Sequence, residues 1–111
     1  MRALVLALVL VLIPAAARCG EFEDELLTRI NAWRQEHGLD ALRRDARLDA
    51  LALEQARAMR AAKRLSHDGF DERFDRAGSN HCVENAGLLW PEPAAKRQFE
   101  GWRDSPGHNE N

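Results

Sequence analysis

Residues 82–89 (Cys-Val-Glu-Asn-Ala-Gly-Leu-Leu) are the one stretch of this chain with the composition of a β-strand. A strand cannot pair its own backbone N–H and C=O groups, so it needs neighbouring strands in a sheet. Residues 18–80 contain no second strand-like stretch, and we expect the partners to lie beyond Asn111. The sequence therefore predicts a domain of helices and strands that is incomplete at its C-terminus.

The first 17 residues have the organisation of a secretory signal peptide. Met1-Arg2 supplies a positive start, residues 4–13 are apolar, and residues 14–17 include the small side chains found at cleavage sites. The apolar run is about half of the ~20 residues that a membrane-spanning helix needs. We therefore expect a signal peptide over 1–17 and an exported domain over 18–111, secreted or periplasmic, with no membrane span after cleavage. An uncleaved anchor is the alternative.

Net charge limits the kinds of partner that this chain could bind, and its cysteines bear on the redox conditions that it meets. The 111-residue chain has a net charge of −2 and no basic stripe, which argues against nucleic acid as a partner. Cys19 and Cys82 would both remain after cleavage, and an exported chain meets oxidising conditions in which they could form a disulfide. Two independent cysteines are the alternative.

Helical periodicity predicts four helices, over 23–37, 46–65, 71–77 and 94–103. Asp45 is a suitable N-cap for the second helix. The connection between the first two helices carries Leu39 and Leu42, which we expect in the core. Pro106 and its neighbours Ser105 and Gly107 predict a helix stop and a turn after the fourth helix.

Two histidines and one glutamate, from three separate segments, are the candidate functional side chains. His67 follows the second helix, Glu84 lies in the strand-like stretch, and His108 follows a Pro-Gly pair. Two histidines, a glutamate and one open position form a known catalytic zinc arrangement. The chain has no His-x-x-x-His pair, however, so a hydrogen-bonded polar cluster lining a cleft stays open as the alternative. Ser105 is no convincing nucleophile, because no strand–turn–helix elbow surrounds it.

The order of these motifs resembles the CAP superfamily, which comprises cysteine-rich secretory proteins, insect venom antigen 5 and plant pathogenesis-related proteins of group 1. The likeness is carried by Leu65-Ser66-His67, by Glu84-Asn85 and by the run from Trp102 to Asn111. The chain is most similar to the short secreted bacterial members. The resemblance implies an α+β fold of the CAP type, an α-β-α sandwich, which would be mostly helical here because the C-terminal strands are missing.

The resemblance also implies a cleft lined by a His, Glu, Glu, His set. His67, Glu84 and His108 match three of its members, and Asn111 matches an asparagine that fixes the following turn. Ser105 stands where other members have the second glutamate, and Asp104 is the nearest carboxylate. Some members bind a divalent metal through the two histidines, which implies zinc at His67 and His108.

Three functions are compatible with this site. The first is a secreted, non-enzymatic and monomeric binding module for an extracellular ligand or lipid, with a cleft that takes a divalent metal. The second is a metal-dependent hydrolase that uses Glu84 as its general base. The third is a non-functional gene fragment.

Overall fold

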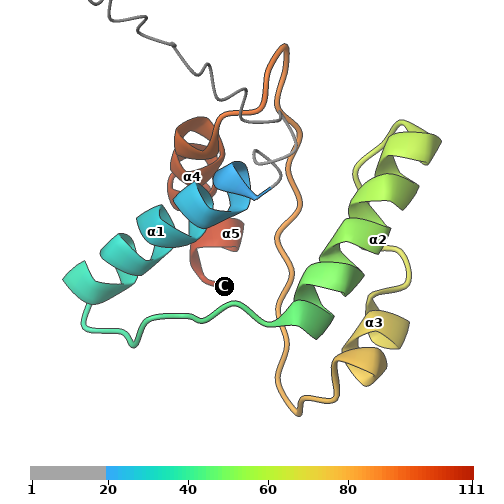
Figure 1. Cartoon of the computed structure of the whole chain (residues 1–111), viewed down its shortest axis with the longest axis horizontal. Coiled ribbons are helices and arrows are strands. Elements are labelled where there is room, and N and C mark those ends of the chain that lie inside the picture. The colour runs from blue at the N-terminus through green and yellow to red at the C-terminus, as the bar shows by residue number, and fades with distance from the viewer. Residues whose placement is uncertain (1–19) are drawn as a thin grey trace, which may run out of the picture.

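The computed structural model describes residues 20–111, in which five α-helices and no strand are formed (Figure 1). The predicted signal peptide and Cys19 lie outside these described residues. Within residues 20–111, no helix is long and apolar enough to cross a membrane.

Helix α1 (Glu21–Glu36) carries an apolar face that includes Leu26, Leu27, Ile30 and Trp33, all partly buried. Acidic side chains in its first turn complement the positive end of the helix dipole. After the C-cap, Gly38 adopts a left-handed backbone with φ of 69°, which only glycine adopts without cost. The helix predicted over 23–37 is confirmed.

Helix α2 (Ala46–Ala62) begins at the predicted cap. The Asp45 carboxylate accepts hydrogen bonds from the backbone N–H groups of Arg47 (2.9 Å) and Leu48 (3.0 Å). The helix ends three residues before the predicted Leu65, because Lys63 turns into the left-handed region at φ of 54°. This early stop releases the loop that carries His67.

Helix α3 (Phe70–Ala77) lies between two glycines with left-handed backbones, Gly69 at φ of 74° and Gly78 at φ of 68°. It packs against α2. Helix α4 (Ala95–Arg103) also follows the prediction, and it packs against α1 with Trp33 and Phe99 in an edge-to-face arrangement, 6.4 Å between ring centroids.

The turn predicted at residues 105–107 is wrong in one respect, because a short fifth helix, α5 (Pro106–Asn109), begins there. Pro106 occupies its first turn, where a proline loses no helical hydrogen bond. Ser105 therefore separates two helices rather than ending the helical region.

The strand predicted over residues 82–89 is not formed within residues 20–111. The segment runs extended between the helices (Figure 1), but it makes no backbone–backbone hydrogen bond to another described segment. Its composition permits an extended backbone, whereas a strand also requires a neighbour to pair with.

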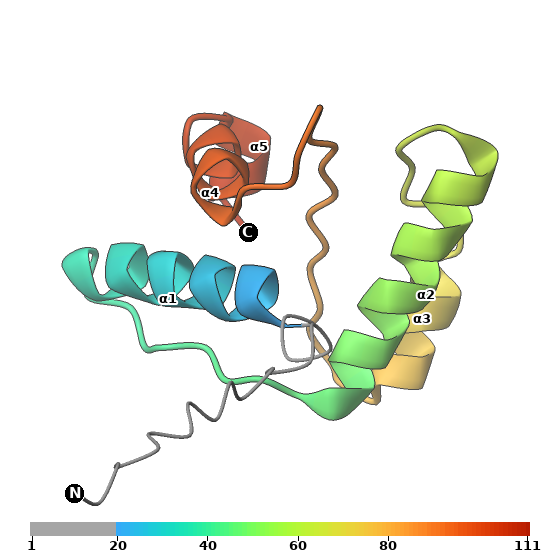
Figure 2. The same cartoon turned by 45° about the horizontal axis from the view of Figure 1, so that its top comes forward.

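The helices form two groups, α1 with α4 and α5, and α2 with α3, and the extended segment passes between them (Figures 1 and 2). Leu51 and Ala95 are the only buried apolar residues within 20–111. Leu39 and Leu42, expected in the core, are instead 51% and 47% exposed, because their connection runs over the surface. The apolar core of the described residues is therefore small.

Candidate functional site

Arg73 is the most highly connected side chain of the site. It projects from α3 and only 10% of its side chain is exposed. Its guanidinium donates two hydrogen bonds to the Glu84 carboxylate, Nε to Oε2 at 2.8 Å and Nη2 to Oε1 at 2.7 Å. The remaining nitrogen, Nη1, donates to Gln55 Oε1 (2.9 Å) and to the carbonyl of Asp68 (2.7 Å). Arg73 thus joins α2, α3, the His67 loop and the extended segment.

His67 lies on the solvent side of this cluster, with 55% of its side chain exposed. Its Nδ1 is 2.8 Å from Glu84 Oε1, the same oxygen that accepts from Arg73. The loop that carries His67 is held from α2, since Gln55 Nε2 donates to the carbonyl of Ser66 at 2.9 Å. Two of the three predicted site residues are therefore in direct contact.

The pKa of Glu84 is lowered from its ordinary value. Partial burial acts to raise the pKa, but the hydrogen bonds from Arg73 and His67, with their charges, outweigh burial. The pKa of Arg73 is correspondingly raised, chiefly by its hydrogen bonds to Glu84. The carboxylate is therefore ionised and accepts from all of its neighbours.

His108, the third predicted residue, contacts a different part of the extended segment. Its carbonyl accepts from Asn85 Nδ2 at 3.2 Å, and Asn85 Oδ1 in turn accepts from Asn111 Nδ2 at 2.7 Å. Glu84 and Asn85 are neighbours in sequence, yet one binds the α3 side and the other the α5 end. Asn111 thus joins the end of the described chain to the extended segment, and its role in fixing the following turn stays a prediction.

Asp104 and Ser105 take separate roles near His108. The Asp104 carboxylate is exposed and paired with the guanidinium of its neighbour Arg103 at 2.7 Å. Ser105 Oγ lies 2.8 Å from His108 Nδ1. No carboxylate within residues 20–111 contacts the ring of His108, so the pair lacks the third group that orients the base in a nucleophilic triad.

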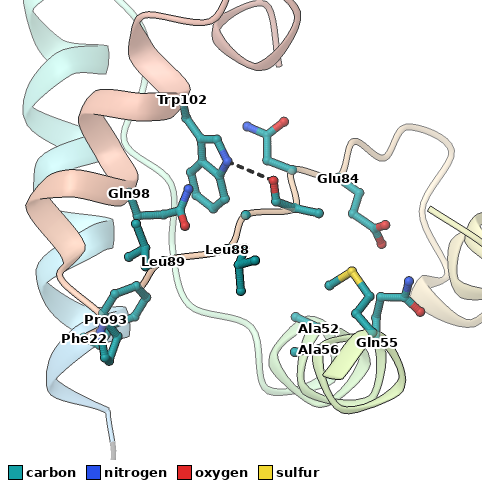
Figure 3. A pocket seen from close by; sticks show the side chains of 14 residues that line it. Phe22, Ala52, Gln55, Ala56, Glu84, Leu88, Leu89, Pro93, Gln98 and Trp102 are labelled. Carbon is teal, nitrogen blue, oxygen red and sulfur yellow. Dashed lines mark hydrogen bonds between the residues drawn. The ribbon is translucent and has the colours of Figure 1, made fainter. Parts of the chain in front are cut away.

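A cavity of about 310 Å³ lies beside Glu84, between α2, α4 and the extended segment (Figure 3). Its wall is largely apolar and includes Ala52, Ala56 and Leu88. Trp102 closes one side and donates its indole N–H to the carbonyl of Ala86 at 3.2 Å, the dashed line in Figure 3.

Gly87 packs closely against a neighbouring side chain in this wall. The amide of the buried Gln98 lies against it, and a Cβ at position 87 would overlap that amide.

A second cavity of about 480 Å³ is lined by residues of α1, the connection after it, α4 and the α5 end, and it includes His108 and Asn111. His67 lines neither cavity.

The predicted zinc ligands are not gathered into one cluster in the described part of the chain. There, no group of three His, Cys, Asp or Glu side chains lies close enough to hold a metal ion. His67 and Glu84 are together, whereas the ring of His108 is bonded to Ser105. Zinc held jointly by His67 and His108 stays a prediction, as does the shared cleft.

Cys82 is half-buried and forms no disulfide with any residue of 20–111. Cys19, with which the sequence leaves a disulfide open, lies outside that range. Both remaining histidines, His37 and His81, are exposed.

Sequence reasoning missed Arg73, although the sequence holds a signal for it. Phe70, Phe74 and Ala77 define the inner face of α3, and Arg73 falls on the same face at the i, i+3 spacing. A cation on an apolar face needs a buried acidic partner. Glu84 is that partner.

Comparison with known proteins adds the identity of the domain. No curated protein and no solved structure matches the chain. A family model does match, the one described as the cysteine-rich secretory protein family, CAP, over residues 27–111. The match covers most of the chain, including every residue of the site described above, and the chain therefore belongs to the CAP family.

Proposed function

We propose that this CAP-domain protein is an exported, non-enzymatic binding module whose ligand contacts His67. The observation that carries the proposal is the ring of His67, more than half exposed and anchored from behind by Glu84. Export is supported by the signal-like residues 1–17 and by the general secretion of CAP proteins. We expect the module to be secreted or periplasmic and monomeric.

The contacts of Glu84 favour binding over hydrolysis. A general base works best with a pKa near the operating pH, which usually requires raising the pKa of a glutamate. The pKa of Glu84 is lowered instead, and its oxygens accept from Arg73 and His67. In this proposal Glu84 holds His67 in place and does not act as a general base. The alternative of a metal-dependent hydrolase is therefore without the base that it requires.

The cavity beside Glu84 suggests the shape of the ligand. Its volume of about 310 Å³ lies at the lower end of the range for small-molecule sites, and its wall is mostly apolar. An extracellular molecule or lipid with an apolar body fits such a wall. The polar end of the ligand would then lie toward Glu84 and His67.

Zinc is the metal that the family resemblance implies at His67 and His108, and it gives a direct test. We expect calorimetry of the purified chain to detect zinc, and we expect His67→Ala and His108→Ala each to weaken its affinity at least about tenfold, because each removes an imidazole ligand. His81→Ala, an exposed histidine elsewhere, is the matched control and should bind as the wild type does.

Three outcomes separate the readings of this experiment. Weaker zinc binding in both His67→Ala and His108→Ala supports a site shared between His67 and His108. Equal affinity in all four proteins would place zinc elsewhere and remove the metal from the proposal. Loss in His67→Ala alone would restrict the site to the Glu84 side.

A further inference from the structure

We infer that Arg73 is the positioning residue of this site: it holds the Glu84 carboxylate against Nδ1 of His67, so that His67 presents Nε2 to its ligand as a bare hydrogen-bond acceptor. The inference rests on the proposed role of His67 in ligand binding. It adds a residue, a tautomer and a direction of approach that the proposed function does not specify.

The first step is the state of the His67 ring. An ionised carboxylate can only accept hydrogen bonds, and Glu84 Oε1 lies 2.8 Å from Nδ1. In the neutral ring the hydrogen must therefore be on Nδ1. The lone pair is then on Nε2, and a partner of His67 must be a hydrogen-bond donor or a metal ion.

The second step is what orients the carboxylate. Glu84 belongs to the extended segment, which makes no backbone–backbone hydrogen bond to another segment within residues 20–111. The two parallel bonds from Arg73 fix the plane of the carboxylate instead, in the bidentate geometry that guanidinium provides. With Arg73 absent, the carboxylate could turn to water and leave Nδ1 unpaired.

The third step is what orients Arg73 itself. Its Nη1 is held by Gln55 on α2 and by the Asp68 carbonyl, one residue beyond His67. The guanidinium thus contacts both the loop that carries the histidine and the carboxylate that pairs with it. This double attachment fixes the two partners relative to each other.

The test reads the tautomer of His67 by proton–nitrogen correlation NMR on the isotope-labelled chain without metal. The signal is assigned by its absence from His67→Gln, at about pH 8.5, where histidine is neutral in model peptides. We expect a single Nδ1–H tautomer in the wild type, and loss of that single form in Arg73→Gln. Arg73→Lys should also lose it, since a lysine keeps the charge without the two-pronged geometry.

Arg76→Gln is the matched control. Arg76 lies on the same helix and makes its own two-bond pair with Glu54 (2.9 Å each), but on the exposed surface away from His67. We expect the His67 tautomer to be unchanged in this variant. Circular dichroism of each variant identifies any that fails to fold.

An Nε2–H tautomer of His67 in the wild type would overturn the inference. This measurement needs no substitution, so the inference can be tested even where the Arg73 variants unfold. A single Nδ1–H form retained in folded Arg73→Gln would overturn it as well. A single Nδ1–H form retained in Arg73→Lys would overturn the part of the inference that rests on the two-pronged geometry, because the positive charge alone would then be sufficient. Because no zinc is present, a failure of zinc binding leaves this result unaffected, and the two ideas can fail separately.

Discussion

At the level of single residues, Glu84 is the side chain on which the site depends. It is mostly buried and ionised, and its oxygens accept from Arg73 and His67. Replacing it by a neutral amide would leave the buried guanidinium of Arg73 without its counter-charge. The same residue thus supports both the fold around α3 and the orientation of the histidine.

We expect Glu84→Gln to lower the free energy of unfolding by about 1–3 kcal/mol near neutral pH. The folded-state pKa of Glu84 is below its unfolded value of 4.5, so its stabilisation is complete above that value and is lost as the pH falls through the folded-state pKa. Urea unfolding of both proteins from about pH 7 to pH 3 should therefore show curves that converge in acid.

The control for this prediction is Glu54→Gln. Glu54 also pairs with an arginine through two bonds, but its side chain is 61% exposed, and water screens the interaction. Glu54→Gln should therefore lower the free energy of unfolding by less than Glu84→Gln does at every pH. A Glu84 variant whose difference from the wild type grows in acid would contradict the sign of the pKa shift.

At the level of elements, helix α2 begins at the Asp45 cap and ends at the turn at Lys63, and the loop that carries His67 follows. We expect Asp45→Ala to lower the free energy of unfolding by about 1 kcal/mol, since two N–H groups lose their acceptor. Thermal unfolding followed by circular dichroism measures this. Asp40→Ala, in the preceding connection, should change stability by less than about 0.5 kcal/mol, because only the backbone carbonyl of Asp40, and not its carboxylate, is hydrogen-bonded among residues 20–111. Equal losses in both variants would contradict the capping role.

Helices were predictable from this sequence because their signals are local. Apolar spacing located α1 to α4, and the cap at Asp45 needed only its own side chain and the next three residues. Residues 82–89 were not predictable in the same way, since strand formation depends on a partner elsewhere. Helix α5 is four residues long, which is too short for a periodic pattern.

The site was predictable in its residue types but not in its partners. The motifs around His67 and Glu84 indicated two residues that the structure brings into contact. They did not indicate that Arg73 is hydrogen-bonded to Glu84 or that Asn85 contacts His108. Such pairings are determined by how the helices pack.

For the molecule as a whole, the described residues bury little apolar surface. Only Leu51 and Ala95 are buried apolar residues there, while Trp90 and Leu88 are 82% and 77% exposed. Buried polar residues outnumber these two, since Gln55, Arg73 and Gln98 are also buried. Hydrophobic burial scales with area, so the stability derived from it must be modest.

We therefore expect the purified chain to unfold in urea with a free energy at or below about 5 kcal/mol, the lower end for natural domains. A single cooperative transition, seen equally by circular dichroism and by tryptophan fluorescence, would argue against the gene-fragment alternative. A gradual loss of signal would support that alternative. A value above about 10 kcal/mol would contradict the small core.

The adjacency of Glu84 and Asn85 has a consequence for the length of the preceding loop. One side chain serves the arginine on α3 and the next serves the end of α5, because successive residues of an extended backbone point in opposite directions. Inserting a single residue between Gly78 and Val83 would shift the register by one and offer Val83 to the guanidinium and the Glu84 carboxylate to the carbonyl of His108. Deleting one would offer Asn85 to the guanidinium and Ala86 to that carbonyl. The length of this loop, more than its composition, therefore determines which side chain meets Arg73.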